Sequence, residues 1–414
     1  MTDRELRRPL RSLARTPGWG WWVVGCFFAR LPVTMVAVAM VLAGRRLGSF
    51  SLGAALAGVA SLSSGFGAWW RARAMDRNEL RGSIARDLAF TAVGLAVVAA
   101  LVQVRGPVLA VGVAVALASI ASSALFAGYR SMLAMLVPPA LLPSSFAIDA
   151  VLVEVAFVCG PAFAGLLSLA VGPAGVLFTM SMAAVVALVG TRRLPRREPI
   201  IQDPGTEPAP APWADAQVMA NYLATAAVGM MLGLFEAGLA PYAVLLGHRD
   251  GVGGLLSAAY AFGSGAGGLV FATRLAGRDG HSRRAIALMA VLGILLVPVA
   301  GAPALPALLG MLLVAGLPFA TTNAAGSSHL QARLHPARAT EGFALSTMFI
   351  LVGIAAGNAL ASLILHVGWS PRFIYLVAGV PPVLAAGAIG AWAVSRSADA
   401  IGSATIHSGN GPRR

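Results

Sequence analysis

Charge is the scarcest feature of this 414-residue sequence. Only 11% of its residues are charged, lysine is absent so that all 30 basic residues are arginines, and 16 residues are acidic. Hydrophobic residues make up 58% of the chain, and a soluble domain needs more charge than this to cover its surface. The composition therefore excludes a soluble protein and indicates a chain that crosses a membrane several times.

Residue patterns that carry enzyme chemistry or bind cofactors are also lacking. The two cysteines, Cys26 and Cys159, both lie in apolar runs, which argues against a disulfide framework. The six histidines are scattered, and no pair has the spacing of metal ligands. The sequence contains neither a phosphate-binding Walker loop nor a His-Glu-x-x-His motif. We therefore expect a protein that is not an enzyme and that uses neither a metal nor another cofactor.

The distribution of arginines along the sequence is typical of a membrane protein rather than of a protein that binds nucleic acid. Although the net charge is +14, the arginines separate apolar segments and do not gather on one basic surface, so we expect no nucleic-acid partner. With twelve spans and the N-terminus in the cytoplasm, 24 of the 30 arginines lie on the cytoplasmic side, 5 lie outside and Arg30 lies within the first span. This asymmetry predicts a multi-pass protein of the plasma membrane, embedded in the lipid bilayer, with both termini in the cytoplasm.

The expected spans form two groups of six. A Pro-rich, charged segment at 191–215 separates an N-terminal half at 19–190 from a C-terminal half at 216–395, and it is predicted to be an exposed cytoplasmic linker. Residues 1–18 and 396–414 are predicted cytoplasmic tails. The spans are expected at about 19–44, 52–70, 87–104, 107–125 or a turn further, 146–167, 173–190, 217–246, 252–276, 285–301, 305–327, 342–366 and 373–394.

The two halves repeat a pattern of small residues. In the fifth span small residues recur at every fourth position, and the eleventh span has the same pattern 197 residues further on. Small residues at this spacing let another helix approach closely. A parallel repeat of this kind predicts an all-α membrane protein with two pseudo-symmetric six-helix halves and a substrate site between them near the middle of the bilayer. The matching residues are Ala156, Gly160 and Ala164 in the first half and Gly353, Gly357 and Ala361 in the second.

Four ionisable residues lie within the expected spans: Arg30, Asp149, Glu154 and Glu236. Such groups are costly in hydrocarbon and usually functional. At about 1.5 Å per residue, Arg30 and Glu154 lie roughly 17 Å and 14 Å from the cytoplasmic starts of their spans, so we expect them to pair, with Glu236 as the alternative partner. A carboxylic acid among apolar residues favours its protonated form, which makes Glu154 and Glu236 candidates for proton coupling. A structural ion pair that does not titrate is the alternative.

The loop after the second span contains the first of two local motifs. It resembles the signature loop of the major facilitator superfamily, G-x-x-x-D-R-x-G-R-R: Asp76-Arg77 and Arg81 match, whereas Ala72 and Glu79 replace the two glycines. In that family the acidic and basic groups of the loop latch the two halves on the cytoplasmic side. The resemblance implies this role for the three matching residues, while the other arginines of the basic loop at 71–86 are read as cytoplasmic anchors.

The fifth span contains the second motif. Gly160-Pro161 and Gly165 match the exporter-associated G-P-x-x-G-G pattern of the same family, and Ala164 replaces one glycine. Pro161 also removes the helix hydrogen bond to the Phe157 carbonyl, which favours a kink. In span count, split halves, linker and both motifs, the chain is similar to the drug-efflux-type transporters of this superfamily, which are common in actinobacteria.

This resemblance implies a secondary active transporter that works by alternating access. We expect it to export small, amphipathic molecules in exchange for protons, and to do so as a monomer. An uptake permease on the same fold and, less favoured, a polytopic membrane enzyme are the alternatives. Polar residues that could contact substrate, or could instead form helix–helix hydrogen bonds, are Ser122, Asn221, Tyr222, Thr322 and Asn323.

Overall fold

The structure, a computed structural model, describes residues 12–76, 79–194, 196, 211–274, 281–335 and 338–391. In these ranges every regular element is helical, and nine helices are long and apolar enough to cross a membrane. The predicted fold class, an all-α membrane protein, is confirmed to this extent. The predicted tail at 396–414, most of the tail at 1–18 and most of the linker at 191–215 lie outside the described residues.

The helices follow the predicted spans in order. The first half consists of α2 (Trp19–Leu47), α3 (Phe50–Asp76), α4 (Leu80–Gln103), α5 (Val108–Ser122), α6 (Leu125–Leu136) and α7 (Leu142–Arg192). The second half consists of α8 (Ala216–Leu245), α9 (Val252–Arg274), α10 (His281–Ile294), α11 (Leu305–Arg333), α12 (Ala339–His366) and α13 (Pro371–Ala378). Short 3₁₀ turns lie at Pro139–Leu141, Pro212–Ala214 and Pro298–Gly301.

Several boundaries differ from those predicted, and the main differences lie in the first half. Most of the expected loop at 71–86 is helical, because α3 continues to Asp76 and α4 begins at Leu80. Arginine is a good helix former, so these helices extend beyond the apolar part of the sequence. The fourth span continues from α5 into α6, which ends at Leu136 and thus extends more than the one turn expected beyond residue 125. The fifth and sixth spans are two helical segments of α7 that meet at Gly172, whose φ of 70° suits a residue without a Cβ.

The same helix pairing occurs in both halves. In the first half α7 packs on α2, where Gly160 lies against the side chain of Thr34. In the second half α12 packs on α8, where Gly353 lies against the backbone of Ala226 and Gly357 against that of Met230. The small residues that repeat 197 positions apart therefore make equivalent contacts, and each half has its own buried apolar core.

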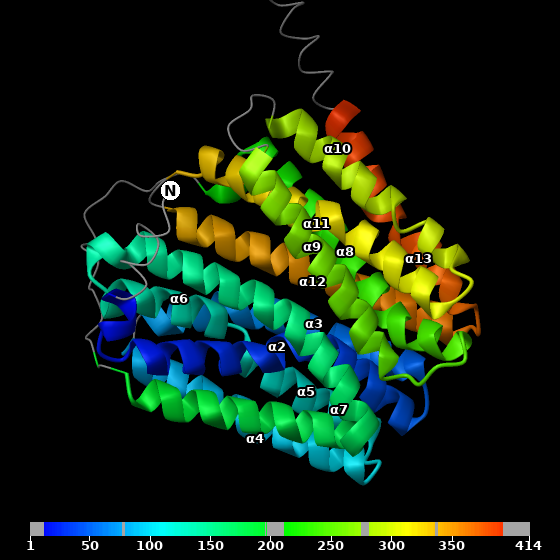
Figure 1. Cartoon of the computed structure of the whole chain (residues 1–414), viewed down its shortest axis with the longest axis horizontal. Helices are drawn as coiled ribbons and strands as arrows, with labels where there is room; N and C mark the ends of the chain where they lie inside the picture. The colour runs from blue at the N-terminus through cyan, green and yellow to red at the C-terminus, as the bar shows by residue number, and fades with distance from the viewer. Residues whose placement is uncertain are drawn as a thin grey trace, which may run out of the picture.

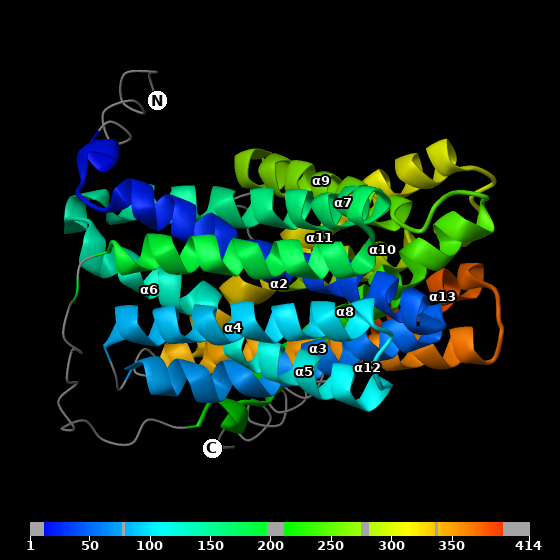
Figure 2. The same cartoon turned by 90° about the horizontal axis from the view of Figure 1, so that it is seen from below.

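The two halves meet along two helix pairs, α3 with α12 and α7 with α9 (Figures 1 and 2). Gly58 of α3 lies next to Ala355 of α12, and nearer the start of α3 the Ser51 hydroxyl donates a hydrogen bond to the Ser362 carbonyl at 2.9 Å. α2 to α6 and the second segment of α7 lie on one side of this interface, and α8 to α11 with α13 lie on the other. The contact of α3 with α12 thus extends from Ser51 at least to Gly65, which lies against Leu351.

The close contact between α8 and α12 gives the first testable prediction. A Cβ added at Gly357 would lie 2.8 Å from the Leu234 amide nitrogen and closer still to the Met230 carbonyl oxygen. Since neither atom belongs to a flexible side chain, we expect Gly357→Ala to destabilise the protein by about 1–3 kcal/mol and to lower its melting temperature in detergent. Gly310→Ala is the control, because nothing lies within 4 Å of that position. Equal melting temperatures for the two variants would contradict this packing.

Candidate functional site

Arg30 and Asp149 form a buried ion pair between α2 and α7. Arg30 Nη2 lies 2.5 Å from Asp149 Oδ1, and Nη1 donates to the Asp149 backbone carbonyl at 3.3 Å. Both side chains are only 2% exposed. The Cys26 thiol, one turn before Arg30, lies 3.9 Å from the same carboxylate oxygen. Arg30 Nε is buried and has no hydrogen-bond partner among the described residues.

The predicted pairing of Arg30 with Glu154 is wrong, and the helical phase of α7 explains why. Asp149 and Gly160 share the face of α7 that packs on α2, whereas Glu154 follows Asp149 by five residues and is rotated from it by about 140°. The similar predicted depth of Arg30 and Glu154 in the membrane also did not identify the right partner. Helical side chains point toward the helix N-terminus, so the Arg30 guanidinium lies nearer the predicted cytoplasmic end of α2 than its Cα.

Glu154 faces the opposite half of the protein. It is exposed, and its Oε2 atom lies 3.9 Å from the position that a Cβ would take at Gly265 of α9. Within the described ranges its carboxylate forms no hydrogen bond or ion pair. Glu154 therefore remains a candidate for proton exchange, although not as the partner of Arg30.

Glu236 lies in the second half of α8 and is partly exposed. The preceding residue, Phe235, packs against Tyr260 of α9 with the ring centroids 4.4 Å apart. The Tyr260 hydroxyl is buried and has no hydrogen-bond partner in the described part of the chain. Like Glu154, Glu236 forms no ion pair with a described residue. The alternative pairing of Arg30 with Glu236 is therefore wrong as well, because Arg30 pairs with Asp149.

Arg130 is a member of the charged cluster that the sequence analysis did not identify. It lies in α6, with Nε 3.9 Å from Asp149 Oδ2 and a side chain that is 65% exposed. Each arginine of the cluster lies over an aromatic ring: Arg30 is 5.0 Å from the centroid of Phe126, and Arg130 is 5.5 Å from that of Phe146. The unexpected length of the fourth span is what places Arg130 here.

The four residues of the exporter-like motif are divided between two helix contacts. Gly160 packs on Thr34 of α2, and Ala164 is fully buried in the core of the first half. Pro161 and Gly165 instead face α9, where a Cβ at Gly165 would lie 2.9 Å from the Gly254 Cα. Because both contacts have no room for a side chain, the motif holds α7 against its own half and against the other half at the same time.

The gate-like motif is only partly described. Arg77 lies outside the described residues, and of Asp76 only the backbone at the end of α3 is placed. Arg81 Nη1 donates to the backbone carbonyls of Leu194, at 2.7 Å, and of Arg192, at 3.3 Å. Arg81 thus caps the C-terminal end of α7, where a cation also interacts favourably with the helix dipole. Its role in a latch between the halves stays a prediction.

A second buried ion pair, also missed in the sequence, joins α3 to α4. The Arg71 guanidinium bonds to the fully buried carboxylate of Asp87, and the Asp87 backbone carbonyl accepts a hydrogen bond from Thr91 at 2.7 Å. Burial, and to a lesser extent Arg86, lowers the pKa of Arg71, which still leaves a guanidinium charged at neutral pH. Asp87 marked the expected start of the third span, so no local signal pointed to a pair with Arg71.

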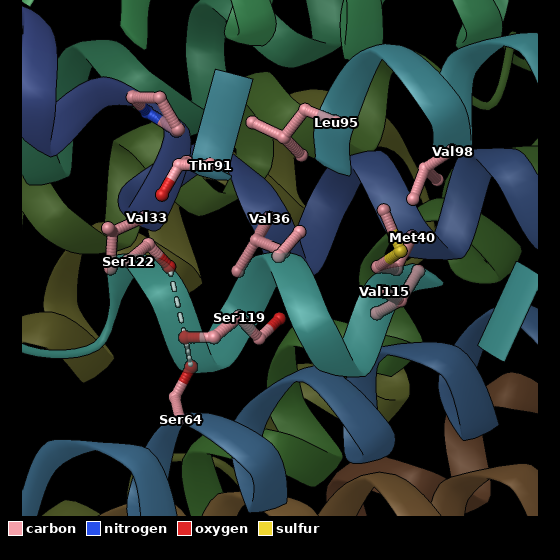
Figure 3. A pocket seen from close by; sticks show the side chains of 12 residues that line it. Val33, Val36, Met40, Ser64, Thr91, Leu95, Val98, Val115, Ser119 and Ser122 are labelled. Carbon is pink, nitrogen blue, oxygen red and sulfur yellow. Dashed lines mark hydrogen bonds between the residues drawn. The ribbon is translucent and has the colours of Figure 1, made fainter. Parts of the chain in front are cut away.

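Ser122 lines a small cavity of about 30 Å³ within the first half (Figure 3). The Ser122 and Ser64 hydroxyls both donate to the Ser119 backbone carbonyl, at 3.2 Å and 3.3 Å. Thr91 and apolar side chains of α2, α4 and α5, among them Val36 and Leu95, complete the lining. A volume of this size accommodates a water molecule rather than an organic substrate.

Of the four residues predicted to contact substrate in the second half, three form hydrogen bonds to backbone carbonyls and one is exposed. The Tyr222 hydroxyl is buried and donates to the Gly342 carbonyl at 3.0 Å, and Thr322 bonds to the Pro318 carbonyl of its own helix. The Asn221 amide donates across to the Gly326 carbonyl of α11 at 3.1 Å. Asn323 is the exposed member of the group. The first three thus have helix-packing roles, and a substrate contact stays a prediction for all four.

Two six-helix halves that repeat one helix pairing and meet along α3–α12 and α7–α9 define the major facilitator fold. Solved structures of this fold superpose on almost the whole chain. The nucleoside transporter NupG, solved as a point mutant, has a TM-score of 0.74 at 12% identity and covers 90% of this chain and 99% of its own. The POT-family transporter PepTSo has a TM-score of 0.72 at 13% identity, covering 91% and 97%.

A third structure, a bacterial homologue of the human lysosomal transporter Spinster in an inward-facing and occupied conformation, has a TM-score of 0.64 at 14% identity and covers 89% of this chain and 95% of its own. No family model and no curated protein sequence matches the chain. At these identities the likeness establishes the fold alone. Together with the apolar helices, it makes the chain an integral multi-pass membrane protein.

The Arg30–Asp149 pair gives the second testable prediction. Removing one partner of a buried pair leaves a stranded charge, at a cost of about 3–5 kcal/mol. We therefore expect Arg30→Ala and Asp149→Ala each to lower folded yield and melting temperature strongly, and the double variant to be less destabilised than the sum of the two. Glu154→Gln is the matched control from the same helix, because it leaves no charge stranded. Additive losses for Arg30 and Asp149, or a loss in Glu154→Gln of the same size, would contradict the assignment.

Proposed function

We propose that this protein is a secondary active transporter that exports small, amphipathic molecules across the plasma membrane by alternating access, in exchange for protons. The major facilitator fold and the exporter-like motif in α7 support this proposal. So do the carboxylates of Glu154 and Glu236, which have no ion-pair partner among the described residues. Two halves joined through close glycine contacts can rock against each other about a site between them.

The observation that carries the proposal is that the polar contacts between the halves and their tightest glycine contact, Gly165 with α9, lie toward one end of the protein. The contacts of Gly58 and Gly65 with α12, further along α3, are looser. Arg45, near the end of α2, and Asp250, which follows α8, lie 3.5 Å apart, and the Ser51 and Ser362 side chains are hydrogen bonded nearby. Gly165 meets α9 in the same outer part of the protein. By the predicted topology this is the extracellular end, so we infer a conformation that is closed to the outside and receives substrate from the cytoplasm.

Proton exchange is assigned to the two carboxylates that have no ion-pair partner among the described residues. Glu154 lies on α7 at the contact with α9, and Glu236 lies on α8 beside Tyr260 of α9. Both carboxylates lie next to α9, which packs on α7 of the other half. A change in their charge therefore alters the energy of the contact between α7 and α9. Asp149 is less suited to this task, because its carboxylate is already paired with Arg30.

Energised inside-out membrane vesicles provide the third testable prediction and the test of direction. An imposed proton gradient, acidic inside, should drive the exported molecule into these vesicles, since their lumen corresponds to the cell exterior. Glu236→Gln should abolish gradient-driven accumulation while leaving exchange of labelled for unlabelled substrate. Glu341→Gln is the control, because this acid forms only a partly exposed pair with Arg338, 3.4 Å apart, and should transport normally. Movement in the opposite direction would instead establish an uptake permease.

The fourth prediction tests alternating access itself. The Ser51 and Ser362 hydroxyl oxygens lie 3.2 Å apart on α3 and α12. With Cys26 and Cys159 replaced by serine, we expect Ser51→Cys combined with Ser362→Cys to form a disulfide under mild oxidation, to stop transport completely, and to recover on reduction. Each single cysteine variant should stay active under the same treatment. A cross-linked protein that still transports at the normal rate would overturn the rocking of these two helices.

A further inference from the structure

The cluster formed by Arg30, Asp149 and Arg130 carries two positive charges and one negative charge. Asp149 satisfies Nη1 and Nη2 of Arg30, but Arg30 Nε remains buried without a hydrogen-bond partner in the described chain. Arg130 Nε lies 3.9 Å from Asp149 Oδ2, which exceeds a hydrogen-bond distance, and its side chain is 65% exposed. One positive charge at this junction of α2, α6 and α7 is therefore not neutralised by the described part of the protein.

The other acidic residues of the first half whose side chains are described do not supply the missing charge. Asp87 bonds to Arg71 between α3 and α4. Glu79 lies 3.6 Å from Arg81, and Glu154 faces Gly265 of α9 on a different side of α7. Asp149 neutralises the buried Arg30, so the excess charge belongs to the exposed Arg130 guanidinium, which is accessible to an external anion.

We propose that the cluster is the binding site for the carboxylate of a small amphipathic anion, held by Arg130 at the exposed end of the cluster. A guanidinium group matches a carboxylate with two parallel hydrogen bonds, and the single excess charge fits a monoanion. The rings of Phe126 and Phe146, which lie beside the two guanidinium groups, supply an apolar wall for the rest of the molecule. This inference rests on the proposed transport function and gives its substrate class.

The test compares two aromatic probes of nearly the same shape, 1-naphthoate and the uncharged 1-naphthamide. Their dissociation constants are measured with the purified full-length protein in a neutral detergent. We expect the carboxylate to bind at least about tenfold more tightly than the amide, as one charge-assisted hydrogen bond implies. Arg130→Gln should remove this preference, and Arg130→Lys should retain part of it because the charge is kept.

Arg193→Gln is the matched control, because Arg193 is also exposed and lies 5.5 Å from the centroid of an aromatic ring, Trp21, but is not part of the cluster. It should keep the full preference for naphthoate. Equal binding of the two probes, or an unchanged preference in Arg130→Gln, would overturn the anion site. Displacement of naphthoate by the short-chain lipid dihexanoylphosphatidylglycerol at lower concentration than by benzoate would assign the cluster to a lipid headgroup and also overturn it.

The binding assay separates this inference from the proposed function. If the purified protein binds naphthoate through Arg130 but vesicles do not accumulate it under a proton gradient, the anion site stands and the transport proposal fails. If vesicles transport an uncharged or cationic dye at the same rate with Arg130→Gln as with the unaltered protein, and naphthoate does not compete, transport stands and the anion site fails.

Discussion

In a bilayer, apolar side chains gain little by leaving lipid for another helix, so helices associate through close packing and hydrogen bonds. This constraint explains the glycines at the principal contacts of the protein. Gly160 lets α7 reach α2, Gly357 lets α12 reach α8, and Gly165 with Gly254 brings α7 and α9 together across the two halves. The first two contacts hold each half together, and the third joins the halves. The same physical device therefore serves both the rigid and the separable contacts.

The first segment of α7 connects these two kinds of contact because its opposite faces have different neighbours. One face carries Asp149 and Gly160 toward α2, and the other carries Glu154 and Gly165 toward α9. On each face the carboxylate precedes the glycine by 11 residues, which is close to three helical turns. A change at Glu154 acts on the contact between the halves, whereas Asp149 remains tied to Arg30 within its own half. This division lets one helix hold a fixed charge and present a second carboxylate to the moving interface.

The fold was predictable from the sequence because the patterns that indicate it lie within short stretches of the chain. Apolar length indicated the spans, and the fourfold spacing of small residues indicated the helix contacts of Gly160 and Gly357. The partner of Arg30 was not predictable, because it depends on how α7 is rotated about its axis and on the direction in which the arginine side chain points. The place of Arg130 in the cluster depended on a helix that runs beyond its apolar sequence. Depth along a span is thus a poor guide to pairing unless helical phase is considered with it.

The strengths of the ion pairs suit a protein whose halves must separate. Arg30–Asp149 and Arg71–Asp87 are buried and lie within the first half, where breaking either would cost several kcal/mol. Arg45–Asp250 joins the halves, but its side chains are 48% and 31% exposed, and a pair of that kind contributes about 1 kcal/mol or less. In the proposed mechanism, rocking of one half against the other would leave the strong pairs intact and, among the described residues, would break weak polar contacts. What remains to hold the outer end closed is the glycine contact of α7 with α9, whose energy is van der Waals packing and falls steeply with separation.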